Sequence, residues 1–526
     1  MRLRLGVIAL VAATSVGASV SAQDAGGSDG PPRDAVEPAP AIDPGTAPDE
    51  NVTPDHDLAP DDVTADTGLA RDGGVTPHEG SWPTDEDDWI EELDDVGPFE
   101  PAEALADPAV DWRPVLPAPA WGLDIAGVAW RPSLEIRARS ETRIGSYLGP
   151  PEQSLVTSRA RVGLEARWRS VRGLLQIQDA RDFGVTPGAP TGATTGIHQG
   201  FLEVGDGRSY LRLGRQEIDW GSGRLIGSLN WQSAARSFDA LRMRGEIHQL
   251  ALEGLVSVIR APGPVTSGTM QVDSAGDWLG GLLLEWIEPE ALRLATYFLF
   301  RHDGPIEAPA GTSDADARRS LDRRRDILAW SLRGSGRIDR RFRYEVELIS
   351  EFGTVDSEGF VALAAIAEAG YRFDVPWQPE IGIGLTYGSG NSPGGGVDEL
   401  DNFFPSNHAI YGLMDLFGLR NQAQTFVRLD ATPDPHVTGW IAARLFWLVE
   451  PTARWSNAGG RTVGVDPTNT DGLAGGEVDV ELRWAPIEHV TLCVGYAVFV
   501  PGGGAAALGH PAPMHFVYVM PGLTLP

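Results

Sequence analysis

The chain has 526 residues, a formal net charge of −31 and one cysteine, and all 42 of its basic residues are arginines. A single cysteine excludes an internal disulfide and any metal site built from several cysteines. The sequence contains no zinc, phosphate-loop or dinucleotide motif, so we expect no metal ion, no cofactor, no bound nucleic acid and no enzymatic activity.

Residues 1–22 have the order of a secretory signal peptide. Arg2 and Arg4 precede an apolar run from Leu5 to Val16, and small residues follow up to Ala22. We expect cleavage after Ala22. No later stretch reaches the roughly 18 apolar residues that a membrane-spanning helix needs, so the mature chain is either soluble or a closed barrel.

Residues 23–118 form an acidic segment rich in Pro, Gly and Ala, with few large apolar side chains. Such a composition cannot bury enough surface to offset the entropy of ordering the chain, and we predict a disordered tail. Up to residue 115, acidic residues outnumber arginines by 23, which leaves a net charge of only −10 for residues 116–526. A solvated linker and a segment that binds a periplasmic partner both fit this tail.

Residues 119–526 carry the pattern of a membrane-spanning barrel. In Leu134–Ile144, apolar or small residues at even positions alternate with Arg and Glu at odd positions, and residues 341–348 repeat the alternation. The runs extend over about 10 residues, whereas strands of soluble proteins average ~5–6. Aromatic residues near the strand ends, among them Trp220 and Tyr297, are typical of a girdle at the membrane surface.

The predicted fold is all-β: a single 18-stranded antiparallel transmembrane β-barrel with a disordered acidic N-terminal tail. The predicted strands begin near residues 130, 158, 171, 198, 209, 236, 248, 278, 291, 326, 341, 361, 379, 422, 436, 476, 490 and 514. Short turns, such as residues 170–173 and 486–489, alternate with long polar connections at 145–157, 182–197, 302–325, 388–421 and 456–475.

Barrels of this kind have short periplasmic turns and longer external loops. We therefore expect the protein in the outer membrane of a Gram-negative bacterium, with the N-terminal tail in the periplasm. Outer-membrane lipid and the barrel insertion machinery would then be its partners.

The segment Tyr210–Trp220 shifts its apolar residues from odd positions at its start to even positions at its end. A β-bulge at Gly214 would account for the shift. Such a bulge would turn Arg215 and Glu217 inward together with Arg212.

Charged side chains on the polar strand faces would line a water-filled lumen, where arginines lower the electrostatic cost for a passing anion. The arginines predicted to line the pore and bind substrate are Arg137, Arg139, Arg161, Arg167, Arg212, Arg215, Arg242, Arg244, Arg343, Arg428 and Arg483. The acidic residues predicted to accompany them are Glu135, Glu165, Glu217, Asp239, Glu345 and Asp430. Each arginine is open to two interpretations, contact with an anion and pairing with an acid across the sheet.

Two segments also resemble a known family. Leu213–Gly227 (LGRQEIDWGSGRLIG), with the downstream residues 230–231 and 235–242, and Phe403–Leu416 (FFPSNHAIYGLMDL) are similar to the signature of the alginate export family of outer-membrane barrels. The resemblance extends over residues 120–526. It implies an 18-stranded barrel with a constricted, arginine-rich lumen that an anionic uronate polysaccharide or a related anion crosses passively. For His408 and Asp415, within the second motif, we expect a role in packing the loop.

The sequence thus favours a passive outer-membrane channel for anionic polysaccharide, such as alginate-like uronates. Two alternatives remain, a general anion-selective porin and a barrel anchor that displays the acidic tail. Gly390–Gly394 match the G-x-S-x-G pattern of hydrolases. This match does not indicate an enzyme, because Pro393 and the glycines after it forbid the strand-to-helix turn that the nucleophile requires.

Overall fold

The computed structural model describes residues 122–525, except 262, 268–269, 288–291, 305, 308–323 and 392–397. The predicted signal peptide and acidic tail lie outside the described residues, and so does most of the hydrolase-like pattern.

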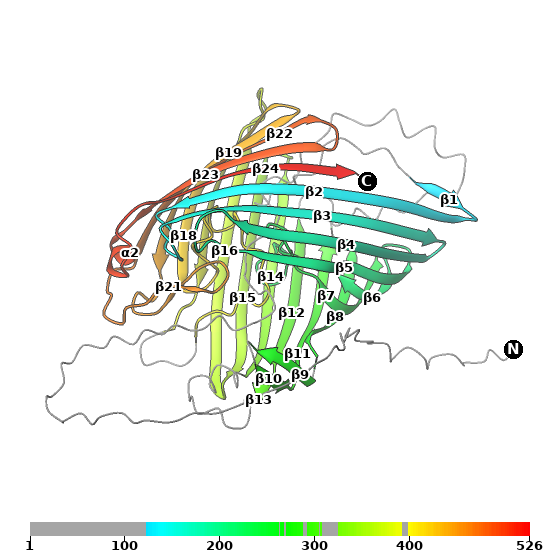
Figure 1. Cartoon of the computed structure of the whole chain (residues 1–526), viewed down its shortest axis with the longest axis horizontal. Coiled ribbons are helices and arrows are strands. Elements are labelled where there is room, and N and C mark those ends of the chain that lie inside the picture. The colour runs from blue at the N-terminus through cyan, green and yellow to red at the C-terminus, as the bar shows by residue number, and fades with distance from the viewer. Residues whose placement is uncertain are drawn as a thin grey trace, which may run out of the picture. The chain divides into compact units, whose positions relative to one another are not determined.

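The described chain forms one large antiparallel sheet of 19 strands (Figure 1). One of them, β1 (Leu123–Ile125), pairs only with the start of the next strand. The other 18 strands form the wall of a barrel. They are β2 (Val128–Ile144), β3 (Glu152–Trp168), β4 (Val171–Gly184), β5 (Gly192–Gly205), β6 (Tyr210–Gln216), β7 (Phe238–Ile247), β8 (Leu250–Arg260), β11 (Asp277–Ile287), β12 (Arg293–Asp303), β14 (Arg325–Ile338), β15 (Phe342–Val355), β16 (Glu358–Arg372), β17 (Glu380–Gly388), β18 (Gln422–Asp434), β19 (Val437–Leu448), β22 (Leu473–Ile487), β23 (Val490–Pro501) and β24 (Met514–Leu525).

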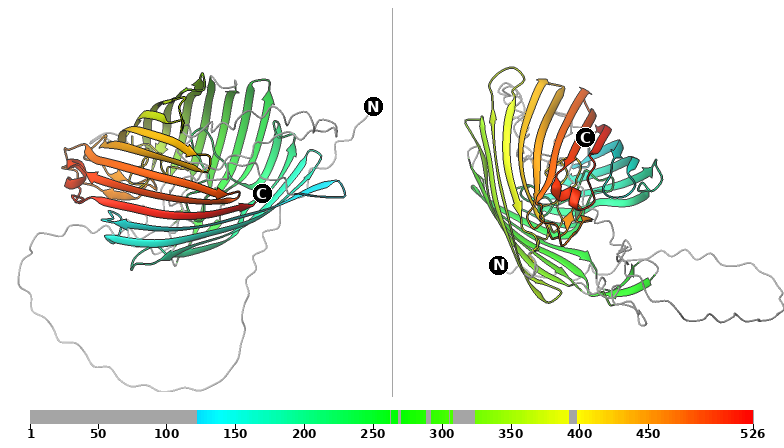
Figure 2. Two further views of the ribbon diagram at one scale, coloured as in Figure 1. Left: turned by 90° about the horizontal axis from the view of Figure 1, so that it is seen from above. Right: turned by 90° about the vertical axis from the view of Figure 1, so that its left-hand side faces the viewer.

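The barrel closes where the last strand meets the first. Strand β24 pairs with β2 from Leu134 opposite Leu525 to Ile144 opposite His515, and both Figure 1 and the left view of Figure 2 show the two strands side by side. A closed wall leaves no unpaired sheet edge, which is the condition for a sheet to stand in lipid. The all-β fold with 18 strands is therefore confirmed.

The strand boundaries differ from the prediction mainly at the loop ends. Strands β3 and β5 begin at residues 152 and 192, so the connections before them are shorter than predicted. The two predicted short turns shrink to Arg169–Ser170 and Glu488–His489, because the residues beside them remain in the strands.

Smaller elements lie in the longer connections. A three-stranded sheet contains β9 (Gly263–Ser267), β10 (Met270–Ser274) and β13 (Ile306–Glu307), and β20 (Trp455–Ser456) pairs with β21 (Thr462–Gly464). The one-turn helix α2 (Gly503–Ala507) lies between β23 and β24. Within the described part of the chain, no helix has the length and apolar character that crossing a membrane requires.

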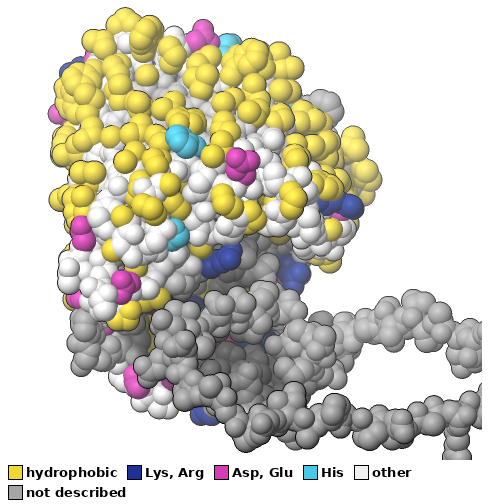
Figure 3. Space-filling model, turned by 60° about the vertical axis from the view of Figure 1, so that its left-hand side comes forward, with side chains coloured by type: hydrophobic (Ala, Val, Ile, Leu, Met, Phe, Trp, Pro, Cys, Tyr) yellow, Lys and Arg dark blue, Asp and Glu magenta, His cyan; other side chains and the backbone are white. Residues whose placement is uncertain are grey.

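The two faces of the wall have opposite character. On β2, Ile136 and Ile144 are about half exposed, whereas Arg137 and Arg139 are buried inside. Apolar side chains cover most of the outer face seen in Figure 3. An apolar exterior around a charged interior is the arrangement that a lipid bilayer demands of a channel.

The aromatic girdle is confirmed only in part. Trp168, Trp330 and Trp484 are exposed on the outer surface. Trp220 and Tyr297 were wrongly placed there, because both are buried inside the barrel, where their rings meet edge to face.

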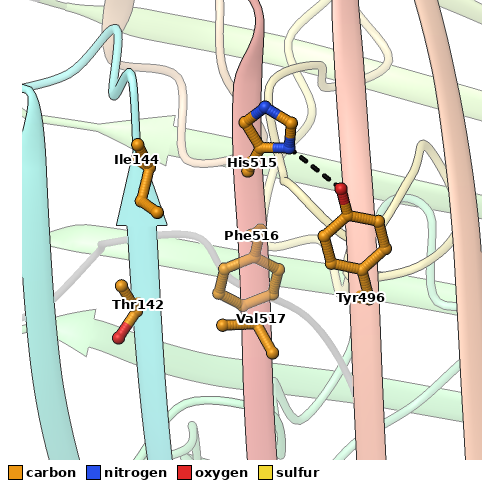
Figure 4. Close-up of a pocket in the computed structure, with 6 residues that line it drawn as sticks. All are labelled: Thr142, Ile144, Tyr496, His515, Phe516 and Val517. Atoms are coloured by element: carbon orange, nitrogen blue, oxygen red, sulfur yellow. Dashed lines mark hydrogen bonds between the residues drawn. The ribbon is translucent and has the colours of Figure 1, made fainter.

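A shallow pocket of about 420 Å³ lies on the outside of the wall, at the seam between the first and last strands (Figure 4). Thr142, Ile144, Tyr496, His515, Phe516 and Val517 line it. The Tyr496 hydroxyl and His515 Nδ1 form a hydrogen bond of 2.9 Å across it. Its lining is almost wholly apolar and faces away from the lumen, so this pocket is not part of the candidate site.

The predicted bulge at Gly214 is not present. Strand β6 pairs with β5 and β7 without a register shift and ends at Gln216. The extra residue lies instead on β5, where Gln176 of β4 pairs with Gln199 and Ile177 pairs with Ile197. His198 is left between these pairs, and it changes the parity of β5.

Candidate functional site: a lumen narrowed by two inner loops

The interior of the barrel contains two segments that the sequence pattern did not place there. Residues 217–237, between β6 and β7, form the first inner loop, which was predicted to be partly strand. Residues 398–421, the described end of the connection between β17 and β18, form the second inner loop. Their large apolar side chains, including Trp220, Trp231 and Tyr411, are almost completely buried. The two loops therefore narrow the lumen.

Arginines of β2 and β3 hold the first inner loop by its backbone. Arg137 donates to three successive carbonyl oxygens, those of residues 230, 231 and 232, at 2.8, 2.9 and 3.0 Å. Arg139 donates to the carbonyl of residue 231 at 2.5 Å, and Arg159 to that of residue 230 at 2.8 Å. The Arg161 guanidinium reaches the side-chain oxygen of Asn230 at 3.0 Å. We call these four residues the arginine clamp.

The two inner loops bind each other along their backbones. The Gly227 N–H donates to the carbonyl of Phe404, and the Phe404 N–H donates to that of Leu225, at 2.9 and 2.8 Å. The Ser406 hydroxyl accepts from the Leu229 N–H at 2.9 Å. Because each loop satisfies buried backbone groups of the other, we expect them to dock as one unit.

The second inner loop is fastened to the wall by side chains of β19 and β22. Arg444 on β19 donates to the carbonyls of Ala409 and Ile410 at 3.0 and 3.1 Å, and it pairs with Asp479 at 2.8 Å. Glu477 accepts from the Met414 N–H at 3.1 Å. These contacts place the family-like motif of residues 403–416 across the lumen.

An aromatic stack joins the clamp to the second loop. The Arg139 guanidinium lies 3.8 Å from the ring centre of Trp231, and the His408 ring stacks on the same indole at 3.6 Å. His408 Nδ1 lies 3.0 Å from a carboxylate oxygen of Asp415. The packing role expected for His408 and Asp415 is confirmed.

Most of the arginines predicted to line the pore have acidic partners. Arg161 pairs with Glu135 and Glu217, Arg167 with Glu165, Arg212 with Glu203, Arg242 with Glu253, Arg244 with Glu253 and Glu285, Arg343 with Glu380, and Arg428 with Asp430. Glu345 pairs with Arg333 and Arg224. Arg483 is buried on β22. These residues lie inside the wall, as their parity predicted, although many of their N–H groups are engaged with protein.

Arg215 and Asp239 were predicted to face the lumen, but they lie on the outer face. Their side chains are 45% and 54% exposed and form an ion pair of 2.7 Å. They share the parity of the exposed Leu213 and Leu241, and no bulge reverses it. The outward position follows from the continuous register of β6 with its neighbours.

Several arginines that bear on the lumen were not predicted. Arg159, Arg333, Arg337 and Arg444 have the inward parity of their strands, so the alternation could have identified them. Arg224 lies in the first inner loop, where it pairs with Glu368 at 2.6 Å. No periodic pattern could have indicated that contact, because it links a loop to a distant strand.

Two carboxylates of the inner loops are held in the charged state. Burial alone would raise the pKa of Glu217, but His198 and Arg161 outweigh it and hold that pKa at about 2. Burial likewise opposes ionisation of Asp401, and the guanidiniums of Arg301 and Arg325 nevertheless keep its pKa well below the ordinary range. Both loops therefore carry fixed negative charges that lie against arginines. Among the described residues, no group of three His, Cys, Asp or Glu side chains is arranged to hold a metal ion.

A closed barrel with a lipid-facing apolar surface, a charged interior and inward loops is an outer-membrane channel. The chain belongs to the alginate export family, whose model matches residues 130–518. This family and this fold are those of channels and not of enzymes. None of the curated proteins compared with the chain matches it.

Solved structures agree on the fold. OccAB1 of Acinetobacter baumannii is 10% identical, with a TM-score of 0.51 over 75% of this chain and 96% of its own. OccD3 (OpdP) of Pseudomonas aeruginosa is also 10% identical, with a TM-score of 0.50 over 81% of this chain and 97% of its own. At such low identity the similarity shows the shared barrel alone.

Proposed function

We propose that this protein is a passive channel for anionic polysaccharide of the alginate type, with selectivity from inward arginines. The observation that carries the proposal is the convergence of guanidinium groups from adjacent strands on the narrowed part of the lumen. Family membership supports the choice of a uronate cargo. A carboxylate that enters this region exchanges water for N–H donors that are already in position, which lowers its cost of desolvation.

The arginine clamp adds a structural argument. Arg137 and Arg159 are about 2% exposed, and they bind backbone carbonyls of the first inner loop. The four guanidiniums of the clamp face three acids, Glu135, Glu141 and Glu217. The clamp therefore keeps a net positive charge beside the passage. A chain of uronates, with one negative charge on each sugar, is matched to such a surface.

Single-channel recording in planar bilayers tests the proposal. An oligouronate is expected to block the current at concentrations where a neutral oligosaccharide of equal length does not, and the reversal potential should show anion preference. A general anion porin would conduct without a block by oligouronate, and a barrel anchor would conduct little. Either result would overturn the proposed cargo.

The acidic tail enters the proposal through its charge. The described chain begins with β1, beside the end of β2 that adjoins the short turns, so we propose that residues 23–118 lie in the periplasm. There the tail would compete with anionic cargo for the arginine-lined mouth. Deleting residues 23–118 should raise the conductance or weaken inward rectification, and more so at low salt, because salt screens the tail's charge. Unchanged currents at low and high salt would contradict this role.

A further inference from the structure

Three arginines from neighbouring strands share one carboxylate at the end of the lumen that carries the short turns. Arg337 near the end of β14, Arg343 near the start of β15 and Arg372 at the end of β16 all bond Glu380, the first residue of β17. The hydrogen bonds are 3.2, 3.3 and 3.3 Å long. They are long for charge-assisted bonds, which usually measure about 2.7–2.9 Å. The Glu380 carboxylate thus accepts hydrogen bonds from three guanidinium groups, and none of these bonds is short.

The charges of this cluster do not balance locally. Arg337 and Arg343 face each other directly across β14 and β15, and like charges in that position repel. The next acid, Asp430, is opposite Glu380 on β18, but Arg428 binds it at 2.7 Å. Glu368 lies 3.9 Å from Arg343, beyond hydrogen-bonding distance, and it already pairs with Arg224. Among the described residues, Glu380 is therefore the one acid that accepts hydrogen bonds from Arg337 and Arg343.

Two guanidinium nitrogens of the cluster are buried without a hydrogen-bond partner among the described residues. They are Nη2 of Arg337 and Nη1 of Arg343. The Arg343 side chain is only 3% exposed. A buried donor without an acceptor costs free energy, and an oxygen-rich anion would remove that cost. Nη1 of Arg343 lies 3.9 Å from the nearer carboxylate oxygen of Glu368.

From this geometry we infer that Arg337, Arg343 and Arg372 form a carboxylate-binding subsite at the periplasmic mouth, distinct from the arginine clamp deeper in the lumen. Glu380 is the internal carboxylate that shares the cations while the subsite is empty. A uronate carboxylate adds the missing acceptors and becomes the first protein contact of a chain that enters from the periplasm. The inference rests on the proposed function, because it takes the cargo to be a polyuronate.

Side-specific block by an oligouronate tests the subsite, in channels reconstituted with known orientation. Arg337→Gln should reduce block from the periplasmic side roughly tenfold, equivalent to about 1.4 kcal/mol, and leave block from the external side unchanged. Glu380→Gln removes the competing carboxylate and should lengthen each periplasmic block. The matched control is Arg341→Gln, four residues away, where an exposed arginine pairs with the exposed Asp374.

The outcomes separate the two proposals. If the wild-type channel is not blocked from either side, the polyuronate cargo is refuted. If it is blocked, but Arg337→Gln behaves like Arg341→Gln, the cargo stands and the subsite is refuted. If Arg337→Gln fails to fold, Arg337→Lys keeps the charge and loses the planar fork. Arg337→Lys should then weaken block from the periplasmic side and leave block from the external side unchanged. Equal weakening from both sides would overturn the subsite.

Discussion

Replacing Arg137 with methionine should release the first inner loop and widen the channel. The substitution keeps an unbranched apolar side chain inside the wall but removes three hydrogen bonds to successive loop carbonyls. A hydrogen bond to a charged group contributes about 1.5–3 kcal/mol. Simple addition would overestimate the loss, because Arg139 and Arg159 also donate to these carbonyls and leave none of them without a partner.

We therefore expect the docked state of the loop to lose about 2–3 kcal/mol, the value of one to two such bonds. This loss raises the released fraction roughly 30- to 140-fold. The barrel itself should stay folded, because none of the strand pairing depends on these bonds. A loop that leaves the lumen increases the cross-section available to ions.

Single-channel recording measures the effect as larger or more frequent high-conductance openings of Arg137→Met than of the wild type. Heat-dependent electrophoretic mobility confirms that the barrel is intact. Arg181→Met is the control, since Arg181 lies on β4 with its side chain half exposed and paired with Asp179. Wild-type conductance and gating in a correctly folded Arg137→Met channel would refute the clamp.

Three further substitutions or conditions test other features. Gly281→Val should displace the Trp220 ring, which lies 2.6 Å from the position that a Cβ would take, and so raise conductance; unaltered currents would show that the ring moves freely. Asp239→Leu removes the ion-pair partner of Arg215 on the outer face, leaves it the Ile197 carbonyl, and should destabilise the barrel by up to about 2–4 kcal/mol. The double variant Arg215→Leu/Asp239→Leu should be at least as stable as the wild type when unfolded from vesicles with urea. An equal loss of stability in the single and the double variant would contradict the outward position of this pair. The lowered pKa of Asp401 means that its contribution to loop docking is fully present above the unfolded pKa of about 3.9 and is lost only as pH falls below it. In the wild type, the second inner loop should therefore stay protected from protease between pH 5 and 7. Asp401→Asn should lose this protection over the same pH range.

The sequence alone determined the barrel and its two faces. Successive side chains of a strand point to opposite faces, one toward lipid and one toward water. Apolar and polar residues must therefore alternate, as they do in Leu134–Ile144. Parity also identified Arg137, Arg161 and Arg343 as inward residues. Closure and strand number followed, because every strand of the pattern needs two neighbours in lipid.

The sequence failed where a single residue changes the parity. The prediction put the shift at Gly214, whereas the structure has it at His198, one strand earlier. The reversal in residues 210–220 has another origin: β6 ends at Gln216, and the buried Ile218 and Trp220 belong to the first inner loop. Only the pairing of neighbouring strands distinguishes a bulge from a strand end, and that pairing decides whether Arg215 faces the lumen or the lipid.

Tertiary structure alone decided what the inward arginines do. Arg137 binds carbonyl oxygens 93 to 95 residues away. Every residue has a backbone carbonyl, so the sequence cannot show which of them an arginine binds. Arg337 and Arg343 became a candidate subsite only because the register sets them opposite each other beside a single shared carboxylate. Burial and parity are properties of one strand and can be read from its sequence. Hydrogen-bond partners and local charge balance depend on several chain segments meeting in space, and the folded barrel is what brings them together.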